Sequence, residues 1–95
     1  MKVIVRERAE KNLYRIVKYI AEKGYPETAL VFLERMREFT LSLGNFPEKY
    51  SVCKQPSYNK RNFRCAVFEE NYIFIHKQVG RNVVLYNVVH VSRIR

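Results

Sequence analysis

The chain has 95 residues, of which 47% are hydrophobic and 28% are charged, a composition typical of one globular domain and not of a disordered segment. It carries 18 Lys and Arg against nine Glu and no Asp, which gives a formal net charge of +9. No apolar run approaches the roughly 18 residues of a membrane span, and no signal-peptide core follows Met1. We therefore expect a single domain over 1–95, located in the cytoplasm and without membrane contact.

Residues 2–6 (KVIVR) predict a short strand. From Glu7 the apolar residues recur with helical period until Gly24, a residue typical of the position after a helix. Pro26 fits the first turn of a second helix, which we expect to end at Gly44. Only the residues GYP separate the two helices, so they should form an antiparallel hairpin. The predicted buried stripes are Ala9, Leu13, Ile16, Val17 and Ile20 in the first helix, and Ala29, Phe32, Leu33, Met36, Thr40 and Leu43 in the second.

Three segments rich in β-branched and aromatic residues follow, at 63–68, 72–76 and 82–91. We expect a tight hairpin turn at 69–71 and a looser one at 78–82. The predicted order is β-α-α-β-β-β. This order indicates an α+β fold, with a mostly antiparallel sheet, the helical hairpin packed on one face and the other face open.

Cys53 and Cys65 form no C-x-x-C motif and no zinc-like cluster with the two histidines. A disulfide between them is possible, but we expect both to be reduced, with Cys65 a small buried residue on the core side. Side chains alternate along a strand, so Arg64 should then lie on the open face of the sheet. We expect no metal and no cofactor.

The positive charge is concentrated in the second half of the chain. Residues 1–48 hold nine cations and seven acids, whereas 49–95 hold nine cations and two acids. The segment 49–64 alone contains five cations and no acid. This asymmetry favours a polyanionic partner, either a nucleic acid or an acidic protein segment. The alternative is a solvated basic surface that only confers solubility.

The sequence contains no P-loop, no H-E-x-x-H and no G-x-S-x-G motif. Its candidate binding residues are the cations Lys54, Lys60, Arg61 and Arg64. Arginine can hold two phosphate oxygens, and a lysine crowded by cations can act as a base, so the cluster suits a phosphodiester target or merely grips an anion. His90 is either an acid/base group or a hydrogen-bonded residue at a strand end. The other polar aromatics are expected to pack: His76, Tyr50, Tyr58, Tyr72 and Tyr86. The alternative for Tyr50 and Tyr58, which flank the basic loop, is to stack on a base.

The element order, the segment FPEKY after the second helix, the strand FRCAVF and the ending VVHVSRIR together resemble the RelE/ParE toxin superfamily of bacterial type II toxin–antitoxin systems. The opening of the first helix, ERAEKNLYRIVKYI, looks like a pattern common in that superfamily. The resemblance covers nearly the whole chain. It implies a growth-inhibiting toxin, of the kind also called a plasmid stabilisation protein, neutralised by a cognate antitoxin. The antitoxin would wrap the toxin with an amphipathic segment and cover its basic sites with acids.

The resemblance leaves the target open. ParE-like members inhibit DNA gyrase and need no known nuclease residues, whereas RelE-like members cleave mRNA in the ribosomal A site. In the RelE-like case the catalytic residues would be Arg64, Arg93 and His90, with Lys60 and Arg61 near the basic loop. The chain stops at Arg95 without the C-terminal tyrosine that some RelE-like enzymes use, which favours gyrase. The remaining alternatives are a toxin-like protein without activity and an unrelated basic binding module.

Overall fold

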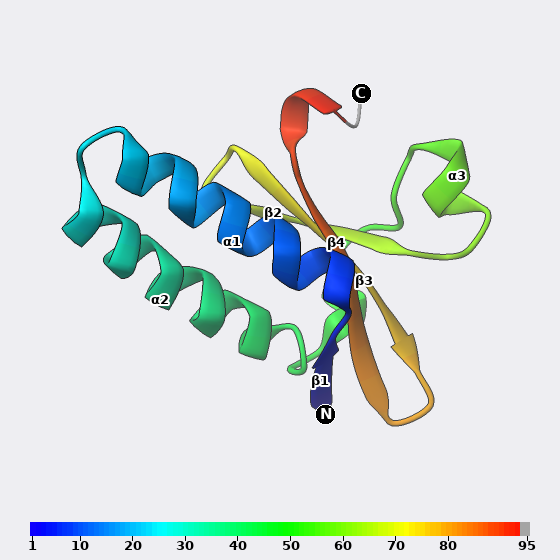
Figure 1. Cartoon of the computed structure of the whole chain (residues 1–95). Coiled ribbons are helices and arrows are strands. Elements are labelled where there is room, and N and C mark those ends of the chain that lie inside the picture. Colours follow the sequence, from blue (N-terminus) through cyan, green and yellow to red (C-terminus); the bar gives the residue numbers. More distant parts are fainter. Residues whose placement is uncertain (94–95) are drawn as a thin grey trace.

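The structure, a computed structural model, describes residues 1–92 and the backbone of Arg93. Its elements are β1 (Lys2–Val5), α1 (Glu7–Glu22), α2 (Pro26–Ser42), the 3-10 turn η1 (Pro47–Lys49), α3 (Pro56–Asn59), β2 (Arg64–Phe68), β3 (Tyr72–Val79), β4 (Asn82–His90) and the 3-10 turn η2 (Val91–Arg93). The predicted α+β order is confirmed (Figure 1). The short helix α3 and the two 3-10 turns were not predicted.

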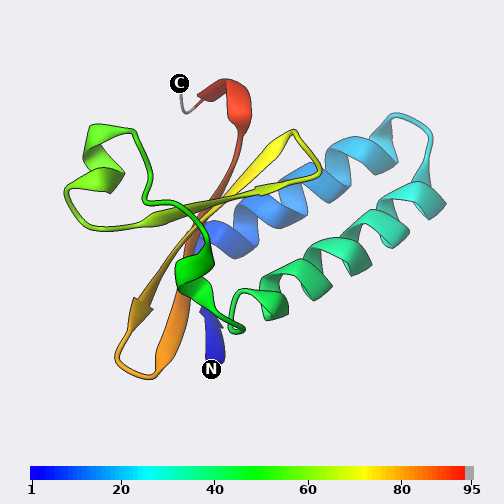
Figure 2. The ribbon, with the colours of Figure 1, turned by 180° about the vertical axis from the view of Figure 1, so that it is seen from behind.

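The strands form one four-stranded sheet in the order β1-β4-β3-β2. β2, β3 and β4 are successive antiparallel neighbours, and β1 joins the edge parallel to β4, with Lys2 opposite Asn82. The sheet is therefore mostly antiparallel, as predicted. The helical hairpin connects the outer strand β1 to the rest of the chain and packs on one face of the sheet (Figures 1 and 2).

Both helices begin and end close to the residues that the sequence predicted. Gly24 has φ +91°, a left-handed conformation that suits glycine after a helix, and Pro26 occupies the first turn of α2. The predicted apolar stripes of both helices are buried or half-buried. They pack against the sheet in one core whose buried members are Ala9, Phe32, Met36, Leu43, Ala66, Phe68, Phe74, Val83, Leu85 and Val88.

Both hairpin turns are tight. Glu69 and Glu70 at the first turn have φ +47° and +68°, and Arg35 of α2 donates two hydrogen bonds of 2.7 and 3.0 Å to the Glu69 carboxylate. The expectation of a looser second turn at 78–82 is wrong. The strands continue to Val79 and resume at Asn82, because Gly80 adopts φ +62° and allows the chain to reverse over two residues.

The face of the sheet away from the helices is covered in part, not open as expected. The loop 51–63 lies on the side of the sheet away from the helices (Figure 2). Beneath it is a second, smaller core. Its buried members are Cys53, Phe63, Ile73 and Ile75, and half-buried side chains of Tyr58, Cys65, Tyr86, Val89 and Val91 pack against them. No helix in the described part of the chain is long and apolar enough to cross a membrane.

The expected facing of β2 is also wrong. Ala66 and Phe68 face the helices, whereas Phe63 and Cys65 face the loop. Phe68 decides this orientation, because its ring lies 5.7, 5.0 and 5.5 Å from those of Phe32, Phe39 and Phe74. An aromatic cluster of this kind outweighs the burial of the smaller apolar set on the opposite side of the strand. Arg64 consequently shares the helix-covered face.

Candidate functional site

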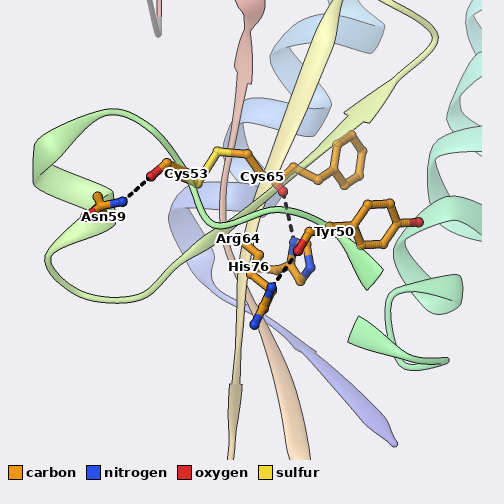
Figure 3. The surroundings of a disulfide bond; sticks show 7 residues. Tyr50, Cys53, Asn59, Arg64, Cys65 and His76 are labelled. Carbon is orange, nitrogen blue, oxygen red and sulfur yellow. Dashed lines mark hydrogen bonds between the residues drawn. A yellow bond between two sulfur atoms is a disulfide. The ribbon is translucent and has the colours of Figure 1, made fainter. Parts of the chain in front are cut away.

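The loop 51–63 carries most of the predicted basic residues. Backbone hydrogen bonds join its two ends. The Cys53 amide donates to the Phe63 carbonyl at 2.8 Å, and the Cys65 amide donates to the Ser51 carbonyl at 3.0 Å. These bonds bring Cys53 and Cys65 within 5.0 Å between Cα atoms, where they form a disulfide (Figure 3). Our expectation of two reduced cysteines, with Cys65 as a buried core residue, is therefore wrong. The 12-residue separation gave no sign that the loop returns on itself.

Inside this loop, α3 begins at a proline and is held by one side-chain contact. Asn59 donates from its amide nitrogen to the Cys53 carbonyl at 2.9 Å (Figure 3). The predicted binding residues Lys54 and Lys60 are exposed around α3. Tyr58 packs edge-on against Phe63, as expected for a structural tyrosine. The loop therefore presents its lysines outward and its aromatic side chains inward.

Arg61 bends back over the sheet instead of projecting into solvent. Its guanidinium carbon lies 4.9 Å from the ring centre of Phe63 and 5.0 Å from that of Tyr86. One guanidinium nitrogen donates to the Tyr86 hydroxyl at 3.5 Å. That hydrogen bond lowers the pKa of Tyr86, and the charges of Arg61, Arg8 and Arg6 lower it further, while burial acts in the opposite direction.

Arg64 lies on the opposite face and contacts the backbone of its own chain. One guanidinium nitrogen donates to the Tyr50 carbonyl at 2.7 Å (Figure 3). The same nitrogen donates to the Glu48 carbonyl at 3.3 Å. Arg64 is half-buried and pairs across the strands with His76. These contacts hold the segment that leads from η1 into the loop. On the helix-covered face, the Arg64 guanidinium therefore contacts backbone carbonyls of its own chain.

His76 is fully buried beside Arg64. Its Nδ1 lies 3.0 Å from the Phe74 carbonyl oxygen, and the Tyr50 ring packs edge-on against the imidazole at 5.4 Å. Among the described residues, the Nε2 atom has no hydrogen-bond partner. Burial lowers the pKa of His76, although the Phe74 and Pro47 carbonyls oppose that effect, and the charge of Arg64 adds to it. The structural role expected for His76 and Tyr50 fits these contacts.

His90 is exposed at the end of β4, at a groove between the sheet and α1. Its Nδ1 accepts a hydrogen bond from the Ser92 amide at 3.2 Å and lies 2.9 Å from the Ser92 hydroxyl. The Tyr72 ring packs edge-on against the imidazole at 5.5 Å. Asn12, Arg15, Ile16, Tyr19, Val88 and Val89 complete the lining of the groove.

The residues predicted for nuclease chemistry do not converge in the described part of the chain. Arg64 pairs with His76 and His90 pairs with Tyr72, on opposite flanks of β3. His76 and Tyr72 are four positions apart, which corresponds to about 13 Å along the strand. Arg61 lies on the other face of the sheet, and the side chain of Arg93 lies outside the described residues. The catalytic assignment of Arg64, Arg93 and His90 stays a prediction.

The structure adds polar residues that sequence reasoning missed. Arg6 and Arg8, at the junction of β1 and α1, join Arg61 around Tyr86, with the Arg8 guanidinium carbon 5.7 Å from the Tyr86 ring centre. Lys77 places its ammonium 5.4 Å from the centre of the Phe63 ring. The pairing of β1 with β4 brings Arg6 and Arg8 close to Tyr86, and this pairing cannot be read from the sequence. The sequence showed only the excess of cations. Among the described residues, no group of three or more His, Cys, Asp or Glu could hold a metal ion.

Solved structures share this fold. One of them is the "Chromosomal ParDE TA system from P. aeruginosa", which superimposes with a TM-score of 0.78 over 95% of both chains, at 15% sequence identity. The comparison with curated protein sequences found no significant match. The sequence profile described as "ParE toxin of type II toxin-antitoxin system, parDE" matches residues 3–95. A match across nearly the entire chain settles the family: the chain belongs to the ParE toxins of type II toxin–antitoxin systems, within the RelE/ParE superfamily.

Proposed function

We propose that this ParE-family toxin arrests growth by inhibiting DNA gyrase and that a cognate antitoxin protein holds it inactive. The observation that carries the proposal is the match to ParE toxins over residues 3–95. ParE-like members of the superfamily act on gyrase, whereas its RelE-like members cleave ribosome-bound mRNA. The proposed site of action is the cytoplasm, where gyrase and the antitoxin would both be available.

The position of Arg64 supports gyrase inhibition over mRNA cleavage. A nuclease arginine must direct its guanidinium at the reacting phosphate in the transition state. Arg64 instead donates to the carbonyls of Tyr50 and Glu48, and His90 lies on the far flank of β3. Such an arginine supports the fold around it. We therefore expect binding, not phosphodiester chemistry, to be the basis of toxicity.

The experiment uses the purified chain in two assays, with the disulfide oxidised and reduced, because cytoplasmic thiols are normally reduced. The wild type should inhibit gyrase supercoiling and leave mRNA on translating ribosomes intact. Cleavage of ribosome-bound mRNA without any effect on gyrase would overturn the proposal in favour of the RelE-like alternative. Inertness in both assays, together with normal growth of cells expressing the soluble chain, would indicate a toxin-like protein that has lost activity.

The proposed antitoxin contact has its own measurement. The second half of the chain has seven more cations than acids, so an acidic antitoxin segment should be steered toward it electrostatically. The association rate of the two proteins should then fall as salt concentration rises. A rate that stays constant from low to high salt would rule out acidic contacts over the basic residues while leaving the gyrase proposal intact.

A further inference from the structure

A compact group of cations surrounds one tyrosine on the loop-covered face. We call it the Tyr86 cluster, formed by Tyr86, Arg8 and Arg61 together with Arg6, whose charge also acts on the tyrosine. Two guanidinium groups, those of Arg61 and Arg8, lie 5.0 and 5.7 Å from the Tyr86 ring centre. The cations come from the β1–α1 junction and the loop, so only the tertiary fold brings them together.

The sheet contains an irregularity at this tyrosine. Along the β3–β4 pairing, Ile75 lies opposite Asn87 and His76 lies opposite Leu85, which leaves Tyr86 without a partner. Such a β-bulge re-aims a side chain and is frequent beside functional sites. Here the bulge places the Tyr86 hydroxyl within reach of the Arg61 guanidinium. The cluster is thus organised by a specific departure from regular pairing.

No carboxylate in the described part of the chain forms a salt bridge with these cations. The salt bridges among the described residues involve Lys11, Lys18 and Arg35, and none involves a member of the Tyr86 cluster. Cations brought together without acids repel one another, and a bound anion would relieve that repulsion. Because a purely solvated basic surface would spread its charges, the placement of two guanidinium groups over one tyrosine ring, one of them bonded to its hydroxyl, points to a ligand.

We propose that the Tyr86 cluster is a binding site for a single phosphate dianion, either free phosphate or a phosphomonoester. A phosphomonoester carries a charge of about −1.5 to −2 near neutral pH and three acceptor oxygens, enough for two guanidinium forks and the tyrosine hydroxyl together. A carboxylate has one negative charge and matches a single arginine fork.

Base stacking does not suit this site. Phe63 is only 5% exposed, and Arg61 and Arg8 lie over the Tyr86 ring. Single-stranded nucleic acid is normally held on open aromatic faces, which the cluster does not offer. The ligand is therefore recognised through its phosphate oxygens. This inference is independent of whether gyrase is the target.

The test is a titration of the whole protein with inorganic phosphate at constant ionic strength, followed by backbone amide NMR. We expect saturable shifts centred on Arg8, Arg61 and Tyr86. In the double variant Arg8→Gln/Arg61→Gln the dissociation constant should rise at least about tenfold, because two charge-assisted hydrogen bonds are lost. The matched control Lys23→Gln/Arg37→Gln removes the same charge from exposed positions on the helical hairpin. Its dissociation constant for phosphate should stay within about twofold of the wild-type value. Equal weakening in both variants would overturn the proposal.

Further arms distinguish the sources of the phosphate. Tighter binding of a 5′-phosphorylated oligonucleotide than of inorganic phosphate indicates a nucleic-acid end, and equal binding of the two indicates free phosphate. An unphosphorylated oligonucleotide that binds as well as its phosphorylated form, or a glutamate-rich peptide that displaces phosphate at equal concentration, would overturn the proposal. Should the double variant fail to fold, Arg61→Lys decides instead, since it keeps the charge but removes the fork and should still weaken phosphate binding.

Discussion

The face of the sheet under the helical hairpin and the face under the loop 51–63 differ in what holds them together and in what they display. The helix-covered face is held by a large apolar core in which Phe74 contacts the rings of Phe39 and Phe68. The loop-covered face has a small core, and the disulfide Cys53–Cys65 closes the segment above it. Burial stabilises the first face, and a covalent constraint supports the second.

The two faces also treat their arginines differently. Arg64, on the helix-covered face, donates to backbone carbonyls and completes the fold. Arg61, on the loop-covered face, makes one long hydrogen bond to Tyr86, and most of its five donors have no partner among the described residues. The contrast shows that Arg64 is engaged by the backbone of its own chain, whereas Arg61 contacts only side chains among the described residues. Four measurements would break or sharpen this comparison.

The largest effect should come from Phe74→Ala in the helix-covered core. Phe74 is fully buried, so its removal leaves a cavity and should lower the free energy of unfolding by about 3–5 kcal/mol. Chemical denaturation measures the change. The matched control is Phe46→Ala, because Phe46 is 82% exposed and its loss should cost less than about 1 kcal/mol. Similar losses for the two variants would contradict the assignment of the main core.

The next effect should come from removing the disulfide. Cys53→Ser/Cys65→Ser opens a loop with a sequence separation of 12, which corresponds to a loss of about 2–3 kcal/mol in unfolding free energy. Amide NMR shifts should be confined to the loop and the face beneath it. A thiol reductant should destabilise the wild type and leave the double variant unchanged. Shifts spread through α1 and α2 would show that the two faces are not separable.

A smaller loss is expected for Arg64→Ala. The substitution leaves the Tyr50 and Glu48 carbonyls without their side-chain donor, at a cost of about 1–2 kcal/mol in unfolding free energy. Arg61→Ala is the matched control on the other face and should cost no more than about 0.5–1 kcal/mol, the scale of an exposed cation–π contact. Denaturant unfolding of the two variants tests the contrast, and a reversed order would refute it.

The smallest effect concerns pH. Burial lowers the pKa of His76, so the folded protein binds fewer protons than the unfolded chain below the ordinary histidine pKa of about 6.5. The contribution of His76 to the free energy of unfolding is complete above about pH 6.5 and is lost as pH falls toward the folded-state pKa. Over that range the free energy of unfolding falls by at most about 1.4 kcal/mol per pH unit. His76→Gln should remove this slope from the unfolding free energy, whereas His90→Gln, at an exposed position, should retain it. An unchanged slope in His76→Gln would contradict the assignment.

Much of the fold depends on interactions between residues close in the sequence, and these local patterns were sufficient to predict the helices. The helical period from Glu7, the glycine at position 24 and the proline at 26 all act within a few residues, so they predicted both helices and their buried stripes. The excess of cations in the second half is likewise a property of composition. The element order then carried the resemblance to the RelE/ParE superfamily.

The site depended on contacts between distant segments, which the sequence alone could not supply. Both faces of β2 are apolar, so alternation left its orientation undecided until Phe68 joined the aromatic cluster of the helical side. The disulfide needed the loop to return beside β2, and the Tyr86 cluster needed both a bulge and the parallel pairing of β1 with β4. Sequence by itself determined the helices, the element order and the charge, because these follow from neighbouring residues. Only the tertiary structure decided the facing of Arg64, the cysteine pairing and the convergence of cations on Tyr86, because each is set by the register between strands and loops far apart along the chain.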